Sequence, residues 1–290
     1  MSADASREVV PRLVAEGGEE GSIQAQSIFS VDTPEELVQF RTSEVERLRE
    51  DVNTPVTQLV TALLQLGVSL ADYPDLGDPE PPFREAKEFI DNDAGLPYSL
   101  ERQVLVRTWG RVLQRKKEFD AADTLFTAAL DETKHSRGRE HPWTLELQNN
   151  LGCLRTAAGV WYATQGRMEV AKECFDGANV LFKKSYKAKL QVFNPIHRAT
   201  LKTKCNISIV SFLRGEASKL EAELVGTLHE LTQSYGTQDS SAKEVASHLV
   251  SIYQRMGNHD RAVDISERFG VDGTYAVHIA LLSTIIGIQS

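Results

Sequence analysis

Apolar side chains recur at intervals of three and four residues along most of this chain, which is the spacing of a helix with one buried face. Residues 33–36 (TPEE) have the pattern of a helix start, in which a threonine caps the backbone and a glutamate three residues later returns a bond to the cap. Further helical patterns begin at Thr54-Pro55, near residue 83 and at a capping Ser99. The chain is therefore predicted to be all α-helical.

Turn-like residues separate these helical patterns at regular intervals. Lys117, Gly159, Gly215 and Gly257 lie 42, 56 and 42 residues apart, and Asp75 lies 42 residues before Lys117. A recurring period of this size is typical of a solenoid built from helix hairpins, and such solenoids bind other proteins far more often than they catalyse reactions.

The 56-residue interval indicates a lengthened hairpin. A second turn signal, Gly166, follows Gly159 by 7 residues, and the return path from Ala171 to His197 is also 7 residues longer than the path from Ala122 to His141. Seven residues make close to two helical turns, so equal additions keep the two arms in register. We predict that the hairpin at residues 144–194 projects beyond the stack, with Gly166-Arg167 at its tip.

Two segments, 110–129 and 159–178, carry the same series of small residues, at which helices cross closely, and large apolar residues between them. This series resembles the tetratricopeptide repeat (TPR) family over about residues 98–270. The segment 141–152 (HPWTLELQNNLG) is similar to the 42-residue subtype found in kinesin light chains. The resemblance implies a right-handed superhelical solenoid of antiparallel helix hairpins. The third repeat departs from the family pattern, because Leu220 replaces the usual small residue.

These patterns divide the chain into four parts. We expect a mobile acidic tail at 1–30, N-terminal helices with a degenerate first repeat at 31–95, TPR-like repeats at 96–270, and an apolar C-terminal helix at 271–290. That helix either caps the last repeat or contacts another subunit.

The first helix of each hairpin lines the concave face in the TPR family, so the resemblance implies a partner-binding face there. The residues expected on it are Arg107, Thr108, Arg111, Asn149, Asn150, Lys202, Asn206 and His248. Asparagine amides can hold a peptide backbone, and the cations can attract carboxylates. Arg107, Asn150 and Lys202 match in part the family's clamp for a peptide C-terminal carboxylate. Two other clamp positions differ, at Arg111 and Asn206, so an unspecialised peptide or protein groove is favoured.

Trp161 and Tyr162 are the other candidate partner-binding residues, because exposed aromatic clusters commonly mark interfaces. The alternative is that they pack on each other and on neighbouring repeats.

Composition and charge argue against several classes of function and location. A net charge of -9 argues against nucleic-acid binding, and the basic run 183–189 is read as a solvated helix face. Three scattered cysteines, Cys153, Cys174 and Cys205, are expected to be buried reduced thiols. No metal, cofactor or catalytic motif is apparent, and no run of apolar residues could span a membrane. The N-terminus has neither a secretory nor a mitochondrial pattern, so an intracellular, cytoplasmic location is expected.

The sequence thus favours a non-catalytic scaffold or adaptor that binds a protein or peptide partner, without a cofactor and within a larger complex. The alternative is an architectural subunit of a large, perhaps cytoskeletal, assembly. A third and less favoured reading is an enzyme or its regulatory subunit.

Overall fold

The computed structural model describes residues 33–92, 100–215 and 220–272, and all regular elements in these ranges are helical. The helices are α1 (Pro34–Glu50), α2 (Val56–Asp72), the short 3₁₀ helix η1 (Pro74–Leu76), α3 (Glu80–Asn92), α4 (Leu100–Arg115), α5 (Phe119–Arg137), α6 (Pro142–Thr164), α7 (Met168–Val192), α8 (Arg198–Leu213), α9 (Leu220–Tyr235), α10 (Ser240–Arg255) and α11 (His259–Phe269). The predicted Ser99 cap, the N-terminal tail and the apolar C-terminal helix lie outside the described residues.

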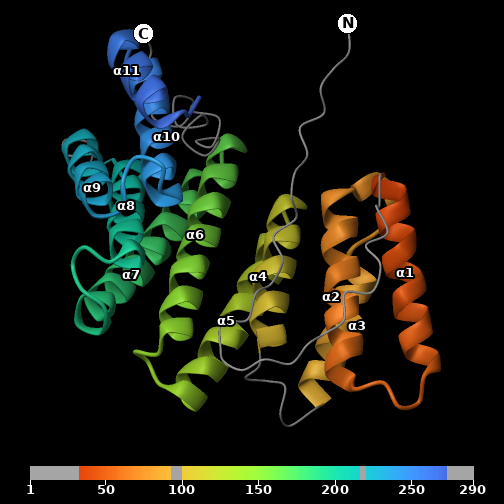
Figure 1. Ribbon diagram of the computed structural model, residues 1–290. Coiled ribbons are helices and arrows are strands. Elements are labelled where there is room, and N and C mark those ends of the chain that lie inside the picture. The colour runs from red at the N-terminus through yellow and green to blue at the C-terminus, as the bar shows by residue number, and fades with distance from the viewer. Residues whose placement is uncertain (1–32, 93–99, 216–219, 273–290) are drawn as a thin grey trace, which may run out of the picture.

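The helices form five antiparallel hairpins that stack side by side, from α2–α3 to α10–α11, with α1 packed on α2 (Figure 1). Each helix packs on the next one in the chain. The first helices of successive hairpins, α2, α4, α6, α8 and α10, also contact one another. We call the surface shared by α4, α6, α8 and α10 the first-helix face. The prediction of an all-α, TPR-like solenoid is confirmed.

The capping pattern at residues 33–36 forms as predicted. The Thr33 hydroxyl accepts from the Glu36 amide, and the Glu36 carboxylate accepts from the Thr33 amide. In α2 the buried residues continue around much of the helix, because α1, α3 and α4 all pack on it.

The first three hairpins, α2–α3, α4–α5 and α6–α7, each contain a glycine that faces a phenylalanine ring sixteen residues later. A Cβ atom on Gly110 would lie 2.3 Å from the Phe126 ring, which is far closer than van der Waals contact allows. Because the glycine has no side chain, the ring lies directly against the facing helix. The three pairs with this spacing are Gly67 with Phe83, Gly110 with Phe126, and Gly159 with Phe175.

Gly159, one of the four turn-like residues, does not turn the chain, whereas Gly166, the predicted tip of the long hairpin, does. Gly159 is a buried residue inside the unbroken helix α6, where it packs on Phe175. The chain turns instead at residues whose φ angles are positive, namely Lys117 (65°), Gly166 (73°), Gly215 (89°) and Gly257 (69°). Their intervals are 49, 49 and 42 residues, so the repeat is more even than the sequence indicated.

The hairpin of α6 and α7 is long, with 23 and 25 residues in its arms against 16 in each of α8, α9 and α10. Measured against the preceding hairpin α4–α5, its extra length is not at the Gly166 tip, because Gly159 and Gly110 each lie seven residues before their turns, at Gly166 and Lys117. The additional residues lie at the opposite end, which we call the extended end.

Measured against α8–α9, the Gly166 tip reaches further out: Asn206 lies 9 residues before the turn at Gly215, whereas its neighbour Asn149 lies 17 residues before Gly166. The predicted projection of the Gly166-Arg167 tip is therefore not seen relative to α4–α5, but it agrees with the contacts to α8–α9.

A second glycine–phenylalanine contact marks the extended end. A Cβ atom on Gly152 would lie 2.6 Å from the Phe182 ring. Gly152 precedes Gly159 by seven residues, and Phe182 follows Phe175 by seven. The same contact is thus repeated two helical turns further along both arms, which keeps the lengthened arms packed on each other.

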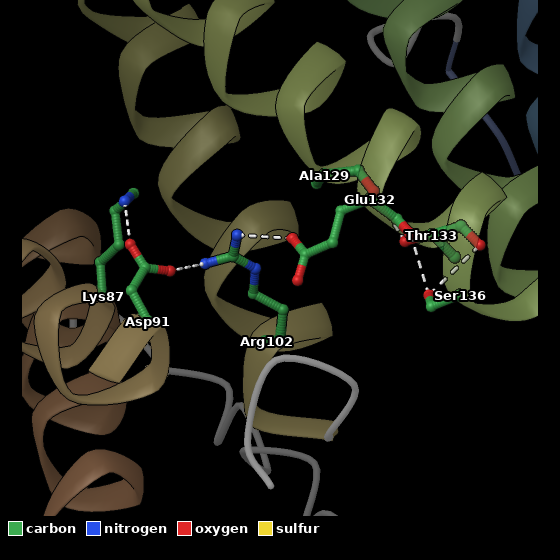
Figure 2. A network of polar contacts seen from close by, with 7 residues as sticks. All are labelled: Lys87, Asp91, Arg102, Ala129, Glu132, Thr133 and Ser136. Atoms are coloured by element: carbon green, nitrogen blue, oxygen red, sulfur yellow. Dashed lines mark hydrogen bonds and ion pairs between the residues drawn. The ribbon is translucent and has the colours of Figure 1, made fainter. Parts of the chain in front are cut away.

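A partly buried ion-pair network joins the N-terminal helices to the following repeats (Figure 2). Arg102 of α4 donates to the Asp91 carboxylate of α3 at 2.6 Å and to the Glu132 carboxylate of α5 at 2.8 Å. Lys87 pairs with the other oxygen of Asp91. One guanidinium therefore fixes three consecutive helices in position.

We expect Arg102→Gln to lower the free energy of unfolding by about 2 kcal/mol, because Asp91 and Glu132 lose the cation that both contact. Urea denaturation measures the change. Arg107→Gln is the matched control, since Arg107 is exposed on the same helix. An equal loss of stability in both variants would contradict a structural role for the network.

Candidate functional site

The first-helix face brings together some of the residues predicted to bind a partner. Asn149 of α6 and Asn206 of α8 lie side by side, with Asn206 Nδ2 3.3 Å from Asn149 Oδ1. Both side chains are half-buried. The exposed Cys153 lies next to them, with its Sγ 3.5 Å from Asn206 Nδ2. These three side chains therefore form a continuous polar surface across two neighbouring hairpins.

The two asparagines retain hydrogen-bonding capacity for a ligand. Asn149 Oδ1 accepts from Asn206 and also lies 3.1 Å from the Thr203 hydroxyl. The Asn149 Nδ2 group has only a weak contact with Cys153 Sγ at 3.8 Å. An acceptor on Asn206 and a donor on Asn149 are thus placed on the same surface, as the backbone of an extended peptide requires.

A buried lysine lies beneath this surface. Lys189 of α7 is 5% exposed, and its Nζ donates to the Thr203 hydroxyl at 2.8 Å and approaches the Ala199 carbonyl at 3.4 Å. Burial lowers the pKa of Lys189 to about 8. The basic run 183–189 is therefore not one solvated face: Lys183, Lys184 and Lys187 are exposed, whereas Lys189 is part of the interior.

The other residues predicted on this face have different surroundings. Arg107 and Arg111 are exposed on α4. Lys202 of α8 pairs with Glu244 of α10 at 2.7 Å, so the cation expected in a carboxylate clamp already has an anionic partner. Asn150 and His248 are half-buried on α6 and α10.

Trp161 and Tyr162 lie away from this polar surface, at the tip end of α6. Their rings pack with Phe119 of α5, at centroid distances of 5.7 Å and 6.1 Å. The Arg167 guanidinium lies 4.6 Å from the centroid of the Tyr162 ring. Both aromatic side chains are half-buried, so much of their surface joins neighbouring hairpins and does not face solvent.

All three cysteines are predicted to be buried, but the structure places them in three different environments. Cys205 is buried, and burial raises the pKa of its thiol. Cys174 is half-buried and Cys153 is exposed, so the expectation of three buried thiols is wrong for these two. Helical periodicity alone does not distinguish a thiol in the core from one on the first-helix face.

Sequence reasoning missed the capping role of two histidines. His141 and His197 precede α6 and α8, and each Nδ1 accepts from the backbone amide two residues later, at 3.2 Å. Their motifs, HPWTL and HRATL, therefore act as helix starts. The sequence did indicate this role, because the two similar motifs each have a histidine immediately before the start of a helix.

Two further findings hold for the described part of the chain. No group of three or more His, Cys, Asp or Glu residues within it is arranged to hold a metal ion. None of its helices has both the length and the apolar character needed to cross a membrane.

Comparison with known proteins supports the fold. No protein-family profile matches the sequence, and no curated protein sequence matches it significantly. Among solved structures, BtubC (BKLC) from P. vanneervenii is similar with a TM-score of 0.57 and 14% identity, over 89% of this chain and 94% of that one. A putative kinesin light chain from Podosopora anserina with TPR-like repeats aligns over 89% of this chain and 100% of that one, at 14% identity and a TM-score of 0.41.

Proposed function

We propose that this TPR-like chain is a non-catalytic protein-interaction scaffold, and that its first-helix face binds an extended segment of a partner protein. The observation that carries the proposal is the Asn149–Asn206 pair, which places an amide donor and an amide acceptor side by side on adjacent hairpins. A backbone in extended conformation offers the complementary acceptor and donor at every residue.

The charges on this face favour a peptide interior over a free C-terminus. A carboxylate clamp needs a cation without a competing anion, and Lys202 is paired with Glu244. The exposed Arg107 and Arg111 lie on α4, the neighbouring first helix, where they can contact acidic side chains of the same partner segment. We therefore propose a partner segment with an acidic residue beside the part of its backbone that the asparagines hold.

We expect the double variant Asn149→Ala/Asn206→Ala to bind such segments about tenfold more weakly, because two peptide hydrogen bonds are lost. Peptides are first selected from a display library with the full-length wild-type chain, and their affinities for both proteins are measured by fluorescence anisotropy. The control is Thr232→Ala/Ser234→Ala, which removes two polar groups from α9, a second helix.

Equal affinity of the selected peptides for the wild type and the asparagine variant would contradict the proposal. An architectural role, the alternative function, predicts a different result. In that case the chain purified from its native source would remain in its assembly after both asparagines are replaced, and no peptide would be enriched by the first-helix face.

A further inference from the structure

A second surface lies on the opposite side of α6, between the second helices α5 and α7. It is a groove of about 380 Å³, a size typical of ligand-binding clefts. Its apolar floor comes from Leu154, Ala158 and Tyr162 of α6 and from Phe119 of α5. Its walls carry Asp120, Asp123 and Thr124 on α5, and Glu173 and Cys174 on α7.

One cation within the groove is already paired. Arg155 of α6 makes two hydrogen bonds to the Asp123 carboxylate, at 2.7 Å and 3.1 Å. Gly177 of α7 leaves space for this guanidinium, since a Cβ atom at position 177 would lie 3.2 Å from Arg155 Nη1. Arg155 is therefore held against the groove wall by its own partner.

The other two carboxylates, Asp120 and Glu173, are exposed and form no ion pair with a described residue. The groove is thus lined by three carboxylates and one guanidinium, and the Arg167 guanidinium lies against its Tyr162, which leaves an excess of one negative charge. Burial is the main reason that the pKa of the Cys174 thiol is raised; Arg155 lowers this pKa, and Asp123, Glu173 and Asp120 each raise it by less.

The aromatic part of the floor already has a cation of this chain against it. The Tyr162 ring already holds one guanidinium, that of Arg167, at 4.6 Å from its centroid. Tyr162 packs with Trp161 and Phe119, so its ring is held in position by the neighbouring hairpin. The attraction of a partner's guanidinium or ammonium group therefore comes from the Asp120 and Glu173 carboxylates.

We propose that this groove binds a basic segment of a partner protein, with an arginine or lysine between Asp120 and Glu173 and an apolar neighbour on the Leu154–Ala158 floor. The apolar stem of the side chain covers the floor, and the charged end reaches the two carboxylates. This surface is separate from the first-helix face, so one chain can hold two partner segments at once.

The test uses three fluorescein-labelled eight-residue peptides in which leucine alternates with arginine, glutamate or glutamine. Their affinities for the full-length chain are measured by fluorescence anisotropy at low and at physiological salt. The arginine peptide is expected to bind more tightly than the glutamine peptide, and the glutamate peptide more weakly than both.

Asp120→Asn/Glu173→Gln is expected to weaken binding of the arginine peptide about fivefold, as two surface ion pairs would. Thr124→Arg should weaken it as well, because it places a competing guanidinium in the groove. The matched control is Asp131→Asn/Glu223→Gln, which removes the same charge from exposed positions on α5 and α9. Its effect is expected to stay below about twofold.

Three results would overturn the proposal. The first is an equal loss of affinity in the control, which would mean that the peptide responds only to net charge. The second is weaker binding in Asn149→Ala/Asn206→Ala with no change in the groove variants, which would place the peptide on the first-helix face. The third is no measurable binding of the arginine peptide to the wild type.

Discussion

Replacement of Gly159 by valine is expected to lower the free energy of unfolding by about 4 kcal/mol. A Cβ atom at position 159 would lie 2.6 Å from the Phe175 ring and 3.0 Å from the Ala171 carbonyl oxygen. The ring could change its rotamer, but the carbonyl belongs to the backbone of α7. The two arms of the hairpin must therefore separate, and they are joined along their whole length by side chains packed to the density of a protein interior.

Urea denaturation followed by circular dichroism measures this loss. Gly226→Ala is the matched control, because Gly226 also lies within a helix but no atom lies within 4 Å of its Cβ position. That control should be more stable than the wild type by about 0.5–1 kcal/mol, since alanine is the better helix former. A loss below about 1 kcal/mol for Gly159→Val would show that α6 and α7 do not need this close approach.

Replacement of Lys189 by methionine is expected to raise the stability at pH 7 by about 2 kcal/mol. Burial lowers the pKa of Lys189 from 10.5 to about 8. At neutral pH the charged lysine therefore lowers the free energy of unfolding by about 3 kcal/mol. Methionine fills a similar volume without a charge, although it loses the hydrogen bond from Nζ to Thr203.

The pH dependence gives the sharper test. Between about pH 8 and pH 10.5 the unfolded chain binds more protons at Lys189 than the folded chain does, so the wild type gains stability as the pH rises. The methionine variant lacks this gain, and its advantage should disappear near pH 10.5. Denaturation curves at four pH values measure the difference. The exposed Lys187→Met serves as the control, and a constant advantage across the range would refute the account.

The sequence predicted the fold because its signals are local. Helical periodicity, the TPEE cap and the series of small and large apolar residues each depend on residues within one hairpin, and all appear in the structure. The 7-residue addition to each arm was also readable from the spacing. The position of these added residues along the arms could not be predicted, because a glycine that turns the chain and a glycine that lets two helices touch look alike in a sequence. Only the φ angle of Gly166 and the Phe175 ring against Gly159 separate them.

The binding surfaces were harder to predict, because they depend on contacts between hairpins. The ion pair of Lys202 with Glu244 joins α8 to α10, and no local pattern predicts it. The burial of Lys189 did have a signal. Ala171, Phe175, Ala178, Phe182 and Ser185 lie on one buried stripe of α7, and Lys189 comes next at the same spacing. Because the neighbouring Lys183, Lys184 and Lys187 are exposed, the whole basic run has the pattern of a solvated face.

The repeated glycine–phenylalanine contact also limits how the long hairpin can change in evolution. A heptad rotates a helix by only about 20° from its starting phase, so arms that gain or lose seven residues together present the same faces to their neighbours. A deletion in one arm alone would set Gly152 opposite a residue other than Phe182. Insertions and deletions in this hairpin should therefore be tolerated only when both arms gain or lose seven residues together. The hairpin can thus change its length only in steps of two helical turns.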